Sequence, residues 1–268
     1  MTSETTAVAG VLESHLRARR DGGHKLLVPY VTGGLQADWP RVVEAVVAAG
    51  ADAVEIGIPF SDPMIDGPTI QAASVAALAR GTTPAAVLDA LVSVEAGAPL
   101  CVMTYYNLVF RAGHRRFARW LADAGVSGAI VPDLPLEEAG GWCAEADDAG
   151  VATVLLVAPS TPPDRAARLC RRSRGFVYGV GRMGVTGERQ RLDSAALLVA
   201  KRLKTLTDLP VLIGVGVSNA EQAAEVCSEA DGVVIGSALV RRLLEGGGPD
   251  EAARFVADIR RHLDAAAG

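Results

Sequence analysis

Short apolar runs alternate with longer, Ala-rich amphipathic stretches along the whole chain. The runs have the length of buried strands, and the stretches repeat their apolar residues at the helical period. This pattern predicts strands at 26–31, 52–58, 99–105, 128–132, 151–157, 175–180, 209–215 and 231–236. It predicts helices between them, for example at 39–50, 114–125 and 219–230. Several of these stretches close with Gly50, Gly125 or Gly150, because glycine tolerates the left-handed turn that ends a helix.

Eight strand-then-helix units in 268 residues predict an α/β fold, a single-domain (β/α)8 TIM barrel over residues 1–268. An open doubly wound sheet is the alternative, but it should carry a G-x-G-x-x-G turn after the first strand. Residues 31–35, VTGGL, do not match that turn. We expect residues 1–20 to form an extra N-terminal helix on the barrel bottom, and 66–99 to hold two helices that divide near 81–84.

Composition narrows the class of protein. The chain is 50% hydrophobic and 21% charged with a net charge of −5, so nothing favours nucleic acid. The four cysteines and four histidines are scattered, without C-x-x-C or metal-ligand spacing. The N-terminus lacks the pattern of a signal peptide, and no stretch is long enough to cross a bilayer. We therefore expect a cytoplasmic protein with no metal site and no nucleic-acid or membrane partner.

The second predicted strand contains a carboxylate, Glu55, among apolar residues. Side chains alternate along a strand, so the branched residues of this strand face the helices while Glu55 points into the barrel beside Ala53 and Gly57. These two small residues leave room next to it. A buried carboxylate is costly unless it is paired or used.

Two aspartates, Asp62 and Asp66, follow in the loop after this strand, which lies at the catalytic mouth of such a barrel. Another interpretation is that Glu55 pairs with an interior polar group and the aspartates cap the next helix. Three carboxylates within a dozen residues at this mouth favour a functional site instead.

Glycine-rich turns follow the last three strands. Gly216 comes after the seventh, Gly236 and Ser237 come after the eighth, and residues 184–187 follow the sixth. In these barrels the loops after strands seven and eight commonly bind phosphate through backbone N–H groups and a helix N-terminus. The sequence therefore predicts a phosphate site.

For a barrel that binds a phosphorylated substrate, three kinds of catalysis are considered: Schiff-base, metal-assisted and carboxylate acid–base catalysis. Schiff-base chemistry needs a lysine at a strand end, but Lys25 lies at the wrong end and Lys201 and Lys204 lie on a helix. Metal-assisted cleavage needs converging ligands, which are not visible. Carboxylate acid–base catalysis by Glu55 and Asp66 remains.

Six motifs together resemble the family of tryptophan synthase α subunits over most of the chain. They lie at 28–32, 55–71, 103–107, 131–135, 184–187 and 231–238. The resemblance implies retro-aldol cleavage of indole-3-glycerol phosphate to indole and glyceraldehyde 3-phosphate.

The resemblance also implies roles for individual residues. Glu55 would be the acid–base group and Asp66 would bind the indole N–H. The substrate-binding residues would be Tyr178, Gly187, Gly216, Gly236 and Ser237. Protonation of the indole ring needs a neutral acid near pH 7, which an apolar surrounding of Glu55 would supply, whereas Asp66 in a wetter loop should stay ionised.

Members of this family work as α2β2 complexes in which indole passes to a β subunit that carries pyridoxal phosphate. The resemblance thus implies a β-subunit partner and no cofactor in this chain. It makes Asp62, Asp133, Arg182 and Thr186 lid or interface residues, with Asp133 holding a lid hydroxyl such as that of Thr186.

The chain departs from the commoner family pattern at 33–36, GGLQ, and at Gly181 and Met183 in the strand-six loop. These departures concern lid closure and communication with the partner. Two alternatives stay open: a stand-alone lyase that releases free indole for secondary metabolism, and a non-catalytic subunit that activates a β partner. The presence of Glu55 and Asp66 counts against the second.

Overall fold

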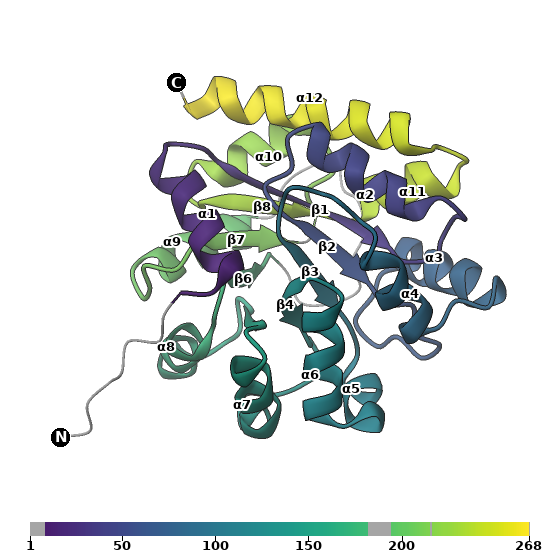
Figure 1. Ribbon diagram of the computed structural model, residues 1–268. Helices are drawn as coiled ribbons and strands as arrows, with labels where there is room; N and C mark the ends of the chain where they lie inside the picture. Colours follow the sequence, from purple (N-terminus) through teal and green to yellow (C-terminus); the bar gives the residue numbers. More distant parts are fainter. Residues whose placement is uncertain (1–8, 182–193, 215, 268) are drawn as a thin grey trace.

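The strands close into a parallel barrel in the order β1-β2-β3-β4-β5-β6-β7-β8, with β8 returning to β1 (Figure 1). The computed structural model describes residues 9–181, 194–214 and 216–267. The strands are β1 (Leu26–Thr32), β2 (Val54–Gly57), β3 (Leu100–Met103), β4 (Val126–Ile130), β5 (Ala152–Val157), β6 (Val177–Val180), β7 (Val211–Gly214) and β8 (Gly232–Ile235). The predicted (β/α)8 barrel is confirmed.

In the described parts of the chain most helices cover the outside of the barrel, whereas the first lies across one end of it (Figure 1). They are α1 (Val11–Asp21), α2 (Trp39–Ala48), α3 (Pro68–Ala79), α4 (Pro84–Leu91), α5 (Tyr106–Ala112), α6 (His114–Asp123), α7 (Gly140–Asp148), α8 (Pro163–Arg172), α9 (Ser194–Lys204), α10 (Ala220–Cys227), α11 (Ser237–Leu244) and α12 (Pro249–Ala267). Residues 66–99 hold two helices, α3 and α4, as predicted, and the hydroxyl of Thr83 caps the second by accepting from the Ala86 N–H.

The helix-ending glycines have the conformation expected of them. Gly50, Gly125 and Gly150 follow α2, α6 and α7 with φ of 106°, 73° and 74°. These left-handed values are costly for residues that carry a Cβ. Each helix thus ends where the sequence places its glycine.

The fourth strand lies two residues earlier than expected. It covers Val126–Ile130 instead of 128–132, because Pro132 has no N–H to donate to a neighbouring strand. The register between β3 and β4 shifts after Leu100, which pairs with Val126, so that Cys101 pairs with Gly128.

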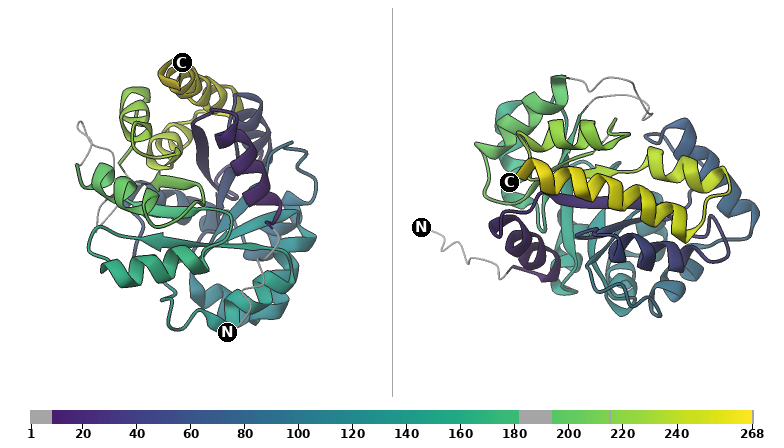
Figure 2. Two further views of the ribbon diagram at one scale, coloured as in Figure 1. Left: turned by 90° about the vertical axis from the view of Figure 1, so that its left-hand side faces the viewer. Right: turned by 90° about the horizontal axis from the view of Figure 1, so that it is seen from above.

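Two apolar layers hold the fold together. The outer layer lies between strands and helices and includes the branched residues of β2, Val54 and Ile56. The inner layer fills the barrel below the mouth, and α1 contributes the fully buried Leu12 and Leu16 to it. The last helix, α12, packs along α2 and α10 (Figure 2).

A buried ion pair ties α12 to the N-terminal ends of β1 and β2. Asp52, 1% exposed, accepts from the Leu27 N–H at 2.8 Å and pairs with Arg260 at 3.3 Å and with Arg19 at 2.7 Å. This ion pair lies at the N-terminal ends of the strands, opposite the C-terminal ends where the functional site is expected.

Candidate active site

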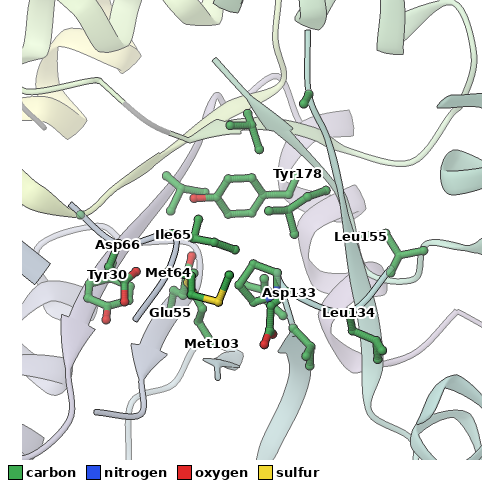
Figure 3. Close-up of a pocket in the computed structure, with 18 of the residues that line it drawn as sticks. Tyr30, Glu55, Met64, Ile65, Asp66, Met103, Asp133, Leu134, Leu155 and Tyr178 are labelled. Atoms are coloured by element: carbon green, nitrogen blue, oxygen red, sulfur yellow. The ribbon is translucent and has the colours of Figure 1, made fainter. Parts of the chain in front are cut away.

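Glu55 points into the barrel from β2 and faces a cavity of about 610 Å³ (Figure 3). Its side chain is 1% exposed, and its Oε2 has no hydrogen-bond partner among the described residues. No described interior polar group therefore pairs with this oxygen, which counts against the interpretation that Glu55 has only a structural role. Ala53 lies below it in the inner layer, as the alternation predicts.

The space at Gly57 is not left beside Glu55 as the sequence suggested. The hydroxyl of Tyr30 lies 1.8 Å from the point where a Cβ on Gly57 would be. A glycine is therefore required at position 57, because the phenol ring of Tyr30 from β1 occupies the space of a side chain there. The absence of a side chain at Gly57 does not enlarge the cavity beside Glu55.

The environment of Glu55 keeps its carboxyl protonated. Burial raises the pKa of Glu55 to about 8, and the negative charge of Asp66 adds to the shift. Removing a carboxylate from water disfavours its charged form, and a nearby like charge does the same. At neutral pH this side chain is thus an acid with a proton to give.

Asp66 is held by a residue to which the sequence analysis gave no role, Tyr105. The Tyr105 hydroxyl accepts from the backbone N–H of Ile65 at 3.2 Å and of Asp66 at 3.3 Å, and it also hydrogen-bonds to the Asp66 carboxylate. Its ring stacks on Phe60 at 4.9 Å. Tyr105 therefore fixes both ends of the loop after β2, and its place just after β3 was the available signal.

Asp66 is half-buried and therefore less exposed to solvent than expected. Burial raises its pKa, while the hydrogen bond from Tyr105 acts in the opposite direction. The aspartates do not cap α3, because the N-cap residue of that helix is Gly67.

Asp62 and Asp133 have surroundings that differ from those of Glu55 and Asp66. Asp62 is exposed, accepts a hydrogen bond from the Ser61 hydroxyl and does not line the cavity. Asp133 lines the cavity and caps α5 by accepting from the Tyr106 N–H at 2.8 Å. The other expected lid or phosphate residues, Arg182, Thr186 and Gly187, lie outside the described residues, as does Met183.

Three of the predicted phosphate residues line the cavity. Gly216, Gly236 and Ser237 follow the paired strands β7 and β8, and α11 begins at Ser237. Gly216 has a φ of 91°, a conformation that favours glycine. A helix N-terminus directed at a cavity presents unpaired N–H groups to an anion.

The remaining wall is mostly apolar and includes Tyr178 on β6. The Tyr178 hydroxyl lies 2.1 Å from the position of a Cβ on Gly214, so this phenol also depends on a facing glycine. Burial raises the pKa of Tyr178, followed in effect by the charge of Glu55. Further apolar lining residues are Met103, Leu134 and Leu155 (Figure 3), together with Ile130 and Leu156. Such a wall suits a flat aromatic ring.

Other kinds of site find little support. Among the residues that the structure describes, no three His, Cys, Asp or Glu side chains are grouped so that they could hold a metal ion. The cavity lining in the same part of the chain contains no lysine. No described helix is long and apolar enough to span a bilayer.

Comparison with known proteins shows which family the chain belongs to. The family model described as tryptophan synthase alpha chain matches residues 16–266. The tryptophan synthase alpha chain of Thermobifida fusca is 44% identical over 261 residues, covering 95% of this chain and 97% of its own. That of Gloeobacter violaceus is 45% identical, covering 92% and 90%.

Solved structures agree as well. A tryptophan synthase structure from Mycobacterium tuberculosis matches with a TM-score of 0.88 at 38% identity, covering 95% of this chain and 98% of that one. A tryptophan synthase complex from Pyrococcus furiosus matches with a TM-score of 0.80 at 33% identity, covering 90% and 98%. The chain therefore belongs to the family of tryptophan synthase alpha chains, lyases that cleave indole-3-glycerol phosphate in tryptophan biosynthesis.

Proposed function

We propose that Glu55 is the acid–base residue of the cleavage. Its proton goes to C3 of the indole ring, and the bond from C3 to the chain carbon then breaks, its electron pair restoring the aromatic ring. The hydroxyl on that carbon loses its proton to the Glu55 carboxylate, and its oxygen forms the C=O bond of the released aldehyde. One observation carries the proposal: Glu55 is a buried carboxyl group with an unpartnered oxygen, facing the cavity, with a pKa of about 8.

Asp66 accepts the indole N–H in this proposal. Protonation at C3 puts positive charge on the ring nitrogen, which a fixed carboxylate stabilises. Burial raises the pKa of Asp66, and the hydrogen bond from Tyr105 opposes that shift by favouring the charged form and holding its position. A negative Asp66 in turn favours the protonated form of Glu55. The mechanism thus uses Glu55 as the acid and the charged form of Asp66 as the acceptor.

The phosphate binds at Gly216, Gly236 and Ser237, and Gly187 contributes a further contact. The support is that the first three residues line the cavity after the paired strands β7 and β8, and that α11 begins at Ser237. Tyr178 and the apolar wall receive the indole ring.

We further propose that the chain works with a β subunit in an α2β2 complex, to which it delivers indole. Two large apolar side chains are exposed in segments that follow β2 and β3: Met64 is 86% exposed and Phe110 on α5 is 66% exposed. Exposed apolar groups near the mouth suit a protein partner. Asp62, Asp133, Arg182 and Thr186 act at this lid or interface.

In this proposal the α chain needs no cofactor of its own, and pyridoxal phosphate belongs to the β subunit. A cytoplasmic location is supported by the four cysteines, which are free and buried.

The experiment is indole release from indole-3-glycerol phosphate by the purified chain, alone and with a cognate β subunit. We expect slow release that rises strongly when the partner is added. Fast release that ignores the partner would instead identify a stand-alone indole-producing lyase. No release under either condition, together with activation of the β subunit, would identify a non-catalytic subunit.

A further inference from the structure

Tyr30 crosses the inner wall of the barrel between two glycines. Near its backbone, the Cβ, Cγ and Cδ1 atoms lie 3.6, 3.8 and 3.9 Å from the position that a Cβ on Gly236 would occupy. At its far end, the hydroxyl oxygen, Cζ and Cε2 lie 1.8, 2.3 and 2.7 Å from the corresponding position on Gly57. The ring therefore runs from the end of β8 to the end of β2.

These two glycines belong to the two halves of the site. Gly236 belongs to the predicted phosphate site formed by Gly216, Gly236 and Ser237, the phosphate cradle. Gly57 is two residues after Glu55 on the same face of β2. The backbone of Tyr30 is also in register with Glu55 across the β1–β2 pair. Tyr30 thus lies between a residue of the predicted phosphate site and Glu55, the group that protonates the ring.

The position of the ring is fixed. Tyr30 is 8% exposed and forms part of the cavity wall beside Glu55 and Asp66 (Figure 3). A phenol ring has only two side-chain torsions, and here its hydroxyl end lies against the backbone of Gly57, while its stem lies beside Gly236 at ordinary contact distance. Its length is therefore a fixed distance within the cavity.

We propose that Tyr30 is a specificity-determining residue that sets the length of the chain joining the phosphate to the aromatic ring of the substrate. This inference rests on the proposed roles of Glu55 and of the phosphate cradle. Indole-3-glycerol phosphate has three chain carbons between the ring and the phosphate ester. With Tyr30 in place, a chain one carbon longer or shorter misplaces either the phosphate or the ring.

The test uses three indol-3-yl alkyl phosphates with chains of two, three and four carbons, bound to the purified chain and measured by isothermal titration calorimetry. They carry no chain hydroxyl and are not cleaved, so the readout is independent of turnover. We expect the wild type to prefer the three-carbon analogue by about 10- to 200-fold over its neighbours, the range that one methylene gives in a fitted pocket. In Tyr30→Leu, the preference over the four-carbon analogue should fall below about threefold. The matched control is Tyr106→Leu, because Tyr106 lies outside the cavity lining and bonds to His114; it should keep the wild-type preference.

A second measurement uses the contact at Gly57. Gly57→Ala forces its new methyl group against the Tyr30 ring, so it should weaken binding of the three-carbon analogue at least tenfold in the wild type. The same change should have little effect when made in Tyr30→Leu, and this coupling identifies the contact.

The outcomes separate the two levels of the argument. If the wild type discriminates among chain lengths and Tyr30→Leu keeps the same ratios, Tyr30 does not set the length and the inference is wrong. If the wild type binds none of the three analogues, both the inference and the proposed phosphate cradle are wrong.

Discussion

Glu55→Gln should change how the stability of the fold depends on pH. The folded protein keeps Glu55 protonated up to about pH 8, whereas the unfolded chain releases this proton above its ordinary pKa of 4.5. Between these values unfolding releases a proton, so the wild type loses stability as the pH rises. The loss amounts to about 1.4 kcal/mol per pH unit, or roughly 4 kcal/mol from pH 5 to pH 8.

Glutamine keeps the shape of the side chain and has no proton to lose, so the variant escapes this loss. Urea unfolding at pH 5, 6, 7 and 8 gives the free energy of unfolding of both proteins, and their difference isolates Glu55 because other groups cancel. The control is Glu221→Gln at an exposed position of α10, which corrects for the loss of one negative charge. We expect the stability of Glu55→Gln relative to the wild type to rise steadily with pH. A difference that stays constant from pH 5 to pH 8 would refute the raised pKa and, with it, the acid assigned to the site.

Three further predictions follow from the same contacts. Asp66→Asn removes the carboxylate that stabilises the ring charge, so kcat should fall about a hundredfold. It also removes the charge that helps raise the pKa of Glu55, so the alkaline limb of the pH profile of kcat/KM should move to lower pH. A limb that does not move would contradict this coupling. Ser237→Ala should raise KM about tenfold with little change in kcat, because a phosphate contact is made equally in the ground and transition states, and a selective loss of kcat in steady-state assays would argue against this. Asp52→Ala leaves the buried Leu27 N–H without its acceptor and leaves Arg260 with the exposed Asp264 as its remaining carboxylate, so it should lower the free energy of unfolding by about 3 kcal/mol in urea titrations, with a loss under 1 kcal/mol counting against a structural role.

Much of the fold could be predicted because a parallel barrel repeats two simple periods. Strands buried on both sides appear as continuous apolar runs, and the helices between them end at glycines. The fourth strand was misplaced because the apolar run continues through Pro132, while the pairing of strands depends on N–H groups that this residue lacks.

The direction of Glu55 could also be predicted, since alternation along one strand fixes which face a side chain takes. The contacts of Tyr105 with the loop after β2, and of Tyr30 with Gly57, could not. They depend on how far a ring reaches from one strand to the next, a tertiary distance that no local pattern contains. The same reason explains why Asp66 is more buried than its Pro- and Gly-rich surroundings suggested.

The most direct test of the acid–base role is indole formation from indole-3-glycerol phosphate by Glu55→Gln. Circular dichroism and binding of the three-carbon analogue should first establish that the variant folds and keeps its site. We predict a kcat about 10²- to 10⁴-fold below that of the wild type with nearly unchanged binding, because only the proton has been removed. A folded variant that binds the analogue and retains most of its activity would contradict the central claim that Glu55 supplies the proton.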